Sequence, residues 1–138
     1  MANRTFGSID PEARKKRPVE QFTMQGLYDF DVTDRAGKVV HSEDEQWSET
    51  FTCLRNPPAG VLDEMVASVG YDRAGNEQYN HLSIVRFLRG VVIPDDEQRL
   101  VDLLNDKARS LDLQDDIGPM FLDLCERLGA RPTTPPSS

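Results

Sequence analysis

The hydrophobic pattern of this chain changes from a period of two to a helical period near residue 54, and this change constrains the fold most strongly. Before it, Phe22 and Met24 alternate with polar residues, as do Phe51 and Cys53. Alternation over such short runs predicts half-buried strands. After it, apolar residues recur at spacings of three and four, which predicts amphipathic helices. The pattern therefore predicts a small N-terminal antiparallel β-hairpin or sheet, followed by helices.

About four helices are expected in the second part of the chain. Pro57 and Pro58 suit the start of the first, because a proline there sacrifices no helical hydrogen bond. Gly70 is expected to end this helix, and the sequence YDRAGN at residues 71–76 is expected to be a loop. The remaining helices are expected over residues 77–92, 94–111 and 113–128, with a start or sharp kink of the last one at Pro119. We expect an α+β fold, mainly α, whose helices pack as a compact bundle.

The length of 138 residues indicates one domain. Residues 1–20 are expected to be a flexible basic leader, with cations from Arg14 to Arg17 and no apolar period. Residues 21–130 are expected to form the single domain, with a β part over 21–54 and a helical part over 55–130. Residues 131–138 are rich in Pro and Ser, which predicts a disordered tail.

The composition disfavours several classes of protein. The chain has 24 acidic and 16 basic residues, giving a net charge of −8, which opposes general binding to phosphate backbones. No apolar run approaches the roughly 18 residues of a membrane-spanning helix. The N-terminus has no apolar segment typical of a secretory signal. Two distant cysteines cannot form a disulfide framework, so we expect a reducing, cytoplasmic setting.

Residues that could carry chemistry are few. His41 and His81 have no partner at metal-ligand spacing, and nothing local marks Cys53 or Cys125 as a nucleophile. The acidic residues before the last helix lack the alternating donors and central glycine of a calcium loop. We therefore expect no enzyme, and no catalytic, metal or cofactor site. A hydrolase that uses His81 with one of the cysteines is the least favoured alternative.

A partner-binding surface is the remaining kind of site. Four apolar residues lie outside the main stripes or at their edges: Tyr79, Phe87, Met120 and Leu122. Residues at such positions can anchor a partner helix in a groove. The alternative is that they are ordinary packing residues, which is common for apolar side chains.

Four motifs of the chain follow one another in a familiar order. They are FTC then NPPAGVL at residues 51–62, IVRFLRGVV at 84–92, IPDDEQRL at 93–100 and GARPTTPPS at 129–137. In this order they resemble the tail assembly chaperones of long-tailed phages that infect actinobacteria. The resemblance covers about residues 50–137. The first 45 residues are longer and more basic than in that family.

The resemblance implies a non-enzymatic function in phage assembly. Such chaperones coat the tape measure protein before the tail tube polymerises around it, and they are absent from the finished virion. It also implies self-association, a longer form made by programmed frameshifting, contact with the major tail protein and a location in the host cytoplasm. An alternative of another class is a small adaptor or regulatory domain that contacts nucleic acid or protein through its basic leader.

Overall fold

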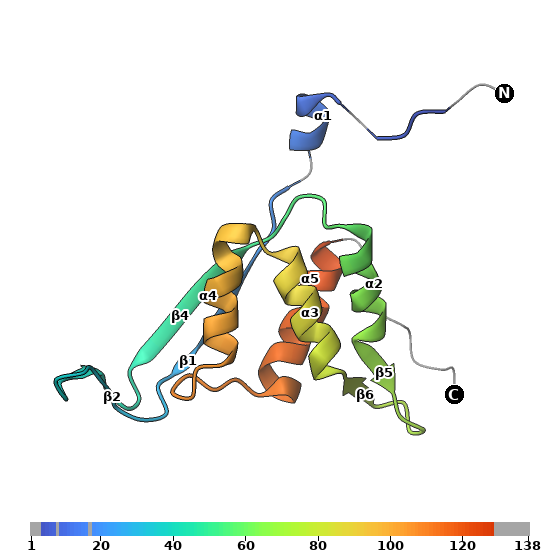
Figure 1. Ribbon diagram of the computed structural model, residues 1–138. Helices are drawn as coiled ribbons and strands as arrows, with labels where there is room; N and C mark the ends of the chain where they lie inside the picture. Colours follow the sequence, from blue (N-terminus) through green and yellow to red (C-terminus); the bar gives the residue numbers. More distant parts are fainter. Residues whose placement is uncertain (1–3, 8, 17, 129–138) are drawn as a thin grey trace.

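The computed structural model describes residues 4–7, 9–16 and 18–128. Figure 1 shows α1 standing clear of the rest of the molecule, which is built from a β ribbon and helices. The elements, in chain order, are α1 (Pro11–Lys15), β1 (Gln21–Leu27), β2 (Val32–Thr33), β3 (Val39–His41), β4 (Gln46–Thr52), α2 (Ala59–Ala67), β5 (Val69–Tyr71), β6 (Glu77–Tyr79), α3 (His81–Val91), α4 (Pro94–Leu104), the π-helical turn η1 (Leu113–Ile117) and α5 (Gly118–Arg127).

Strands β1 and β4 form the longest pairing, an antiparallel ribbon that the short β2–β3 pair extends. Phe22 lies opposite Phe51 in the register, and their rings stack with centroids 5.3 Å apart. Gly26 lies opposite Trp47, whose indole covers the glycine. These side chains share one face of the ribbon, and that face is buried. The alternation predicted for residues 21–54 therefore places β1 and β4 correctly.

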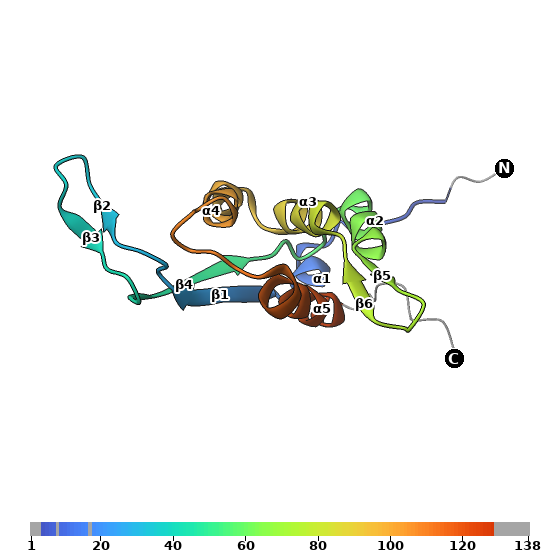
Figure 2. The same ribbon diagram turned by 90° about the horizontal axis from the view of Figure 1, so that it is seen from below.

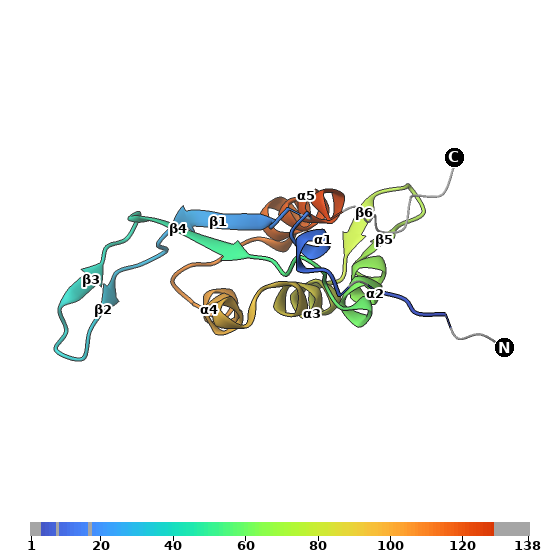
Figure 3. The ribbon, with the colours of Figure 1, turned by 90° about the horizontal axis from the view of Figure 1, so that it is seen from above.

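The helices form a layer against the buried face. In Figures 2 and 3, α2, α3 and α4 lie side by side in one layer, while α5 lies with the ribbon in the other. The core lies between these layers, and Phe87 of α3 meets Phe121 of α5 edge-to-face at 5.2 Å. Further fully buried side chains of the helices are Met65, Ile84, Leu88, Leu100, Leu103 and Leu124.

The segment between α3 and α4 joins the helices to the ribbon. The Leu54 N–H donates to the Val91 carbonyl at 2.7 Å, and the Ile93 N–H donates to the Thr52 carbonyl at 2.9 Å. Cys53 and Val92 form an isolated antiparallel bridge between these two bonds. The end of β4 therefore fixes where α3 ends and α4 begins.

The same turn occurs twice, in the sequences DRAGK and DRAGN. The Asp34 carboxylate accepts the N–H groups two and four residues later, at 2.9 and 3.0 Å, and Gly37 has a φ of +81°. The Asp72 carboxylate does the same at 2.9 Å to both amides, and Gly75 has a φ of +84°. Positive φ is the region that glycine tolerates best. Each turn therefore connects two antiparallel strands.

The predicted fold class is wrong. The strands of the described residues form three separate two-stranded sheets, and one of them, β5–β6, lies between α2 and α3. The chain is thus not one small hairpin followed by a helical bundle. The physical cause is the second turn, centred on Asp72 and Gly75, because it makes a hairpin of the segment predicted as a loop.

This second hairpin also shifts the neighbouring helices. The first helix ends at Ala67 rather than Gly70, which lies in β5. Helix α3 begins at His81 rather than residue 77, because the Asn80 side chain accepts the Ser83 N–H at 3.2 Å and caps the helix there. Asparagine is a strong N-cap residue, so this start has a local signal in the sequence.

The last helix is interrupted close to the predicted position. Residues 113–117 form η1, and α5 begins at Gly118 with Pro119 in its first turn. The Asp112 carboxylate accepts the Asp115 N–H at 2.7 Å, while the Asp116 carboxylate accepts the Asp112 N–H at 2.8 Å. These reciprocal bonds fix the start of η1.

The two ends of the chain are described in part. Within the leader, α1 is exposed, and Lys15 approaches Glu12 at 3.8 Å. The predicted tail over residues 131–138 and the cation Arg17 lie outside the described residues. Among the helices that the structure describes, none has the length and apolar content to cross a membrane.

Two helical glycines should respond oppositely to substitution by alanine. Helix propensity alone favours alanine by about 1 kcal/mol at either site. A Cβ on Gly90 would lie 2.5 Å from Cγ2 of Val61, whereas a Cβ on Gly60 would meet nothing within 4 Å. We expect Gly90→Ala to lower the free energy of unfolding by about 1–3 kcal/mol because of overpacking. Gly60→Ala, the control, should leave it unchanged or raise it. Urea denaturation measures both, and equal stabilisation would contradict the α2–α3 contact.

Candidate partner-binding groove

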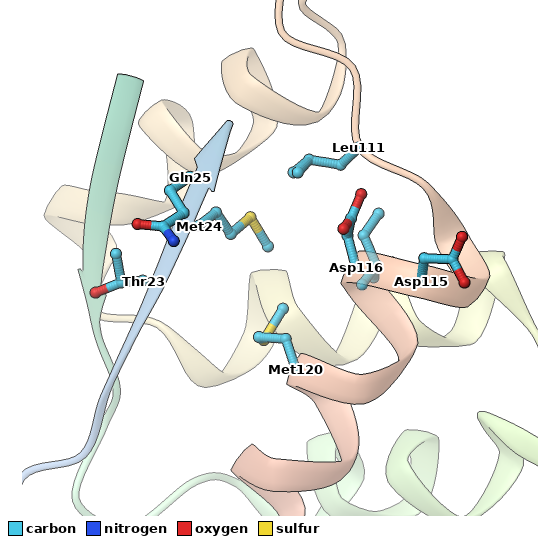
Figure 4. A pocket seen from close by; sticks show the side chains of 8 residues that line it. Thr23, Met24, Gln25, Leu111, Asp115, Asp116 and Met120 are labelled. Atoms are coloured by element: carbon cyan, nitrogen blue, oxygen red, sulfur yellow. The ribbon is translucent and has the colours of Figure 1, made fainter. Parts of the chain in front are cut away.

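A groove runs between β1 and the junction of η1 with α5. Its cavity has a volume of about 200 Å³. Figure 4 shows Met24 and Met120 pointing toward each other from the strand and the helix, with Leu111 above them. The full lining is Thr23, Met24, Gln25, Leu111, Asp115, Asp116, Ile117 and Met120. The groove therefore combines apolar side chains with two carboxylates and a strand edge.

The pairing of β1 with β4 leaves the groove side of β1 with outward-facing backbone groups. The Cys53 N–H donates to the Glu20 carbonyl at 2.8 Å, and the Tyr28 N–H donates to the Glu45 carbonyl at 2.9 Å. In an antiparallel ladder such bonded pairs recur at every second residue. The even-numbered residues of β1 therefore bond to β4, while the amides and carbonyls of Thr23 and Gln25 point away from it.

One end of this edge is covered by a side chain from α5. The Arg127 guanidinium donates to the Gln21 carbonyl at 2.5 Å and to the Glu20 carboxylate at 3.1 Å. Beyond this point, no bond from another part of the described chain reaches the outward backbone groups of Thr23 or Gln25. The edge is therefore open along the wall of the groove.

The opposite edge of the ribbon is covered by α4. The Thr52 N–H donates to the Asp96 carboxylate at 2.8 Å, and the Arg99 guanidinium donates to the Thr50 carbonyl at 2.7 Å. Arg99 also lies 4.3 Å from the centroid of the Phe51 ring. The two edges of the ribbon are therefore unequal: α4 occupies the end of the β4 edge at Thr50 and Thr52, whereas the β1 edge borders the groove.

The segment after α4 is fixed to the ribbon and positions Leu111 in the groove. The Asp29 N–H donates to the Ala108 carbonyl at 2.8 Å, and the Ser110 hydroxyl donates to the Asp29 carboxylate at 2.6 Å. The Arg109 guanidinium donates to Glu49 at 3.1 Å and to Asp106 at 2.7 Å. This wall of the groove is thus held by bonds to β4 and to the segment that follows β1.

The junction of η1 with α5 is fixed by a close aromatic contact. A Cβ on Gly118 would lie 2.6 Å from the Tyr79 ring, so only glycine lets the ring lie this close to the backbone. The Tyr79 hydroxyl donates to Glu77 at 2.5 Å. Desolvation of the hydroxyl raises the pKa of Tyr79, and the hydrogen bond to Glu77 raises this pKa further. Tyr79 therefore fixes the position of Gly118, at the start of α5, without itself lining the groove.

The four apolar residues chosen from the sequence occupy different environments. Met120 lines the groove, and Tyr79 packs behind it. Phe87 is fully buried in the core, where no partner can reach it while the helices stay packed. Leu122 is half-buried against the core and does not line the groove.

Sequence reasoning missed most of the groove. Alternation places Met24 in a strand, whereas Leu111 and Ile117 fall in segments predicted as helices, and neither pattern indicates an open edge on β1. One signal was available. The stretch QFTMQGL has no charged residue in a chain with 29% charged residues. An uncharged strand lacks the usual protection against pairing with another strand.

The histidines and cysteines lie elsewhere. The His41 ring stacks on Tyr28 at 4.5 Å and bonds to Glu45 through Nδ1. Cys53 and Cys125 are both buried. Burial raises the pKa of Cys53 to about 11 and that of Cys125 to about 12. Within the described part of the chain, no group of three or more His, Cys, Asp or Glu residues is placed to hold a metal ion.

Comparisons with family models, with curated proteins and with solved structures gave no match.

Both thiols should be unreactive in the folded protein. A thiolate is the reactive form, and at pH 8 a thiol with a pKa of 11 or more is almost wholly protonated. We expect 5,5′-dithiobis(2-nitrobenzoate) to label neither cysteine at pH 8 on mixing. In guanidinium chloride it should label both. Rapid labelling of the folded protein would instead reveal an accessible thiolate, which the hydrolase alternative requires.

Proposed function

We propose that this protein is a tail assembly chaperone. In the proposal it binds and solubilises the tape measure protein of a long-tailed phage in the host cytoplasm, then leaves before the virion is complete. It acts by binding and not by catalysis. The groove beside β1 is the observation that carries the proposal, because it offers an apolar surface next to an open strand edge. The order of the motifs at residues 51–62, 84–92, 93–100 and 129–137 supports the same function.

The charge of the molecule suits this role. The net charge of −8 favours solubility. The carboxylates of Asp115 and Asp116 lie beside the apolar lining of the groove. An insoluble client bound there gains the solubility of the acidic chain. Self-association along a long client, and contact with the major tail protein and a frameshifted longer form, belong to the same proposal.

A substitution in the groove should abolish capture of the client. In the test, the full chain is co-expressed with fragments of the tape measure protein from the same genome, and the soluble complex is purified through a tag on the client. We expect Met120→Glu to reduce recovery of the complex at least tenfold, because it places a charge in the apolar lining. Val66→Glu is the matched control, since Val66 is an exposed apolar residue on α2, outside the groove.

Circular dichroism and thermal unfolding test whether both variants are folded. If the wild-type chain leaves every fragment insoluble, the proposed function is wrong. If Met120→Glu and Val66→Glu capture the client equally well, the groove is not the binding site. If Met120→Glu does not fold, Asp115→Lys replaces it, because the Asp115 carboxylate is exposed at the groove.

A further inference from the structure

We propose that the groove binds its partner as an added β-strand. An extended segment would lie between β1 and the junction of η1 with α5, pairing with the edge of β1. The segment would have alternate aliphatic residues and a lysine or arginine at its flanks. The identity of the natural partner rests on the proposed function, whereas the mode of binding rests on the geometry of the groove.

The backbone of β1 favours an extended partner over a helical one. The amides and carbonyls of Thr23 and Gln25 face the groove, and the described chain supplies them with no partner. A helix uses its own backbone groups internally, so it cannot satisfy those of β1. An extended segment presents the complementary amides and carbonyls at the same repeat.

The side chains of the groove suit alternate aliphatic residues. Successive side chains of an added strand would point to opposite faces of the ribbon. Those on the buried face would enter the cavity between Met24, Ile117 and Met120. Those on the other face would lie beside Thr23 and Thr50, whose hydroxyls are 2.8 Å apart. Apolar residues are therefore required only at every second position.

The carboxylates of the groove favour a partner segment that carries positive charge. Asp115 and Asp116 lie at the far wall of the groove, and within the described residues no ion pair neutralises either carboxylate. A second copy that paired through its own β1 would place η1 of both copies on the same face, beside the shared edge. Like carboxylates would then approach one another, which opposes this dimer. A lysine or arginine on the partner would instead gain from both carboxylates.

The absence of edge protection agrees with this reading. Natural edge strands carry charged residues, proline or a bulge that prevents pairing with another chain. Strand β1 has no charged residue and no proline, and its register with β4 is continuous from Gln21 to Leu27. On strand β4, the Thr52 amide and the Thr50 carbonyl are bonded to Asp96 and Arg99. The edge of β1 that borders the groove therefore lacks both a charged residue and a covering helix bond at Thr23 and Gln25.

Amide exchange on the full-length ¹⁵N-labelled chain tests the mode of binding. The probe is the peptide acetyl-Lys-Thr-Val-Thr-Val-Thr-Lys-amide, in which the lysines and valines share one face. We expect it to slow exchange of the Thr23 and Gln25 amides about tenfold or more, since these would gain partners, while the Phe22 and Met24 amides stay as they are. A peptide with glutamate at both lysine positions should bind at least about tenfold more weakly.

Two proline variants provide a matched pair. Gln25→Pro removes an amide that faces the groove, and Ser48→Pro removes the outward amide of the residue opposite it on β4. Neither change removes a bond of the β1–β4 ladder. We expect Gln25→Pro to weaken binding of the peptide about tenfold, and Ser48→Pro to leave it unchanged.

Backbone methylation of the peptide gives the same test without altering the protein. Two peptides carry N-methyl groups on either the valines or the threonines, so that each has one edge blocked. An added strand requires that only one of the two loses binding. If Gln25→Pro fails to fold, the two methylated peptides still test whether the partner binds as an added strand.

Several results would overturn the inference. One is binding of the peptide with no change in exchange at Thr23 and Gln25. Another is equal loss of binding in both proline variants, or in both methylated peptides. Protection of Thr23 and Gln25 that grows with protein concentration alone would show that a second copy occupies the edge. No binding of the peptide at any concentration would also refute it.

The outcome is separable from that of the proposed function. If the peptide protects the edge while no tape measure fragment binds, the mode of binding stands and the proposed function fails. If a tape measure fragment binds and leaves exchange at Thr23 and Gln25 unchanged, the function stands and the added strand is wrong.

Discussion

The fold depends on covering one apolar face of a two-stranded ribbon. Phe22 and Phe51 stack on that face, but two strands alone are only marginally stable in water. With no third strand described beside β1 or β4, the helices must supply the cover. Helix α4 does this and also bonds to the edge of β4 through Asp96 and Arg99. The packing of the helices is thus a consequence of the ribbon, and the bundle expected from their stripes alone does not form.

The same constraint explains why the β1 edge differs from the β4 edge. Helix α5 lies beside β1, but its first turn is held by the contact between Gly118 and the Tyr79 ring and by the bonds at the start of η1. Among the described residues of α5, only Arg127, at the other end of the helix, bonds to the backbone of β1. The space that remains between the fixed junction and the strand is the groove. Its shape therefore follows from contacts made on both of its sides.

Elements marked by a local sequence pattern could be predicted, whereas features that depend on contacts between distant residues could not. Alternation located β1 and β4, and Pro94 located the start of α4. The β5–β6 hairpin has strands of three residues, too short to show alternation, so only the repeated Asp-Arg-Ala-Gly turn could have revealed it. The groove joins Met24 to Met120, and no local pattern predicts that two such distant residues meet. Burial of Phe87 was likewise hidden, because a broad apolar arc does not tell which of its residues faces the core.

A short open edge suits a partner that must be released. Arg127 closes the edge at Gln21, so an added strand could bond to β1 only from Thr23 onward. Each backbone bond contributes a net of about 0.5–1.5 kcal/mol, so a few of them give limited affinity. Charge at Asp115 and Asp116 would speed encounter more than it would strengthen the complex. A site of this kind binds many similar segments weakly, and a long client offers many such segments. Under the proposed function, occupancy along the tape measure protein would depend on the number of bound copies, and competition from the polymerising tail tube would remove them one by one.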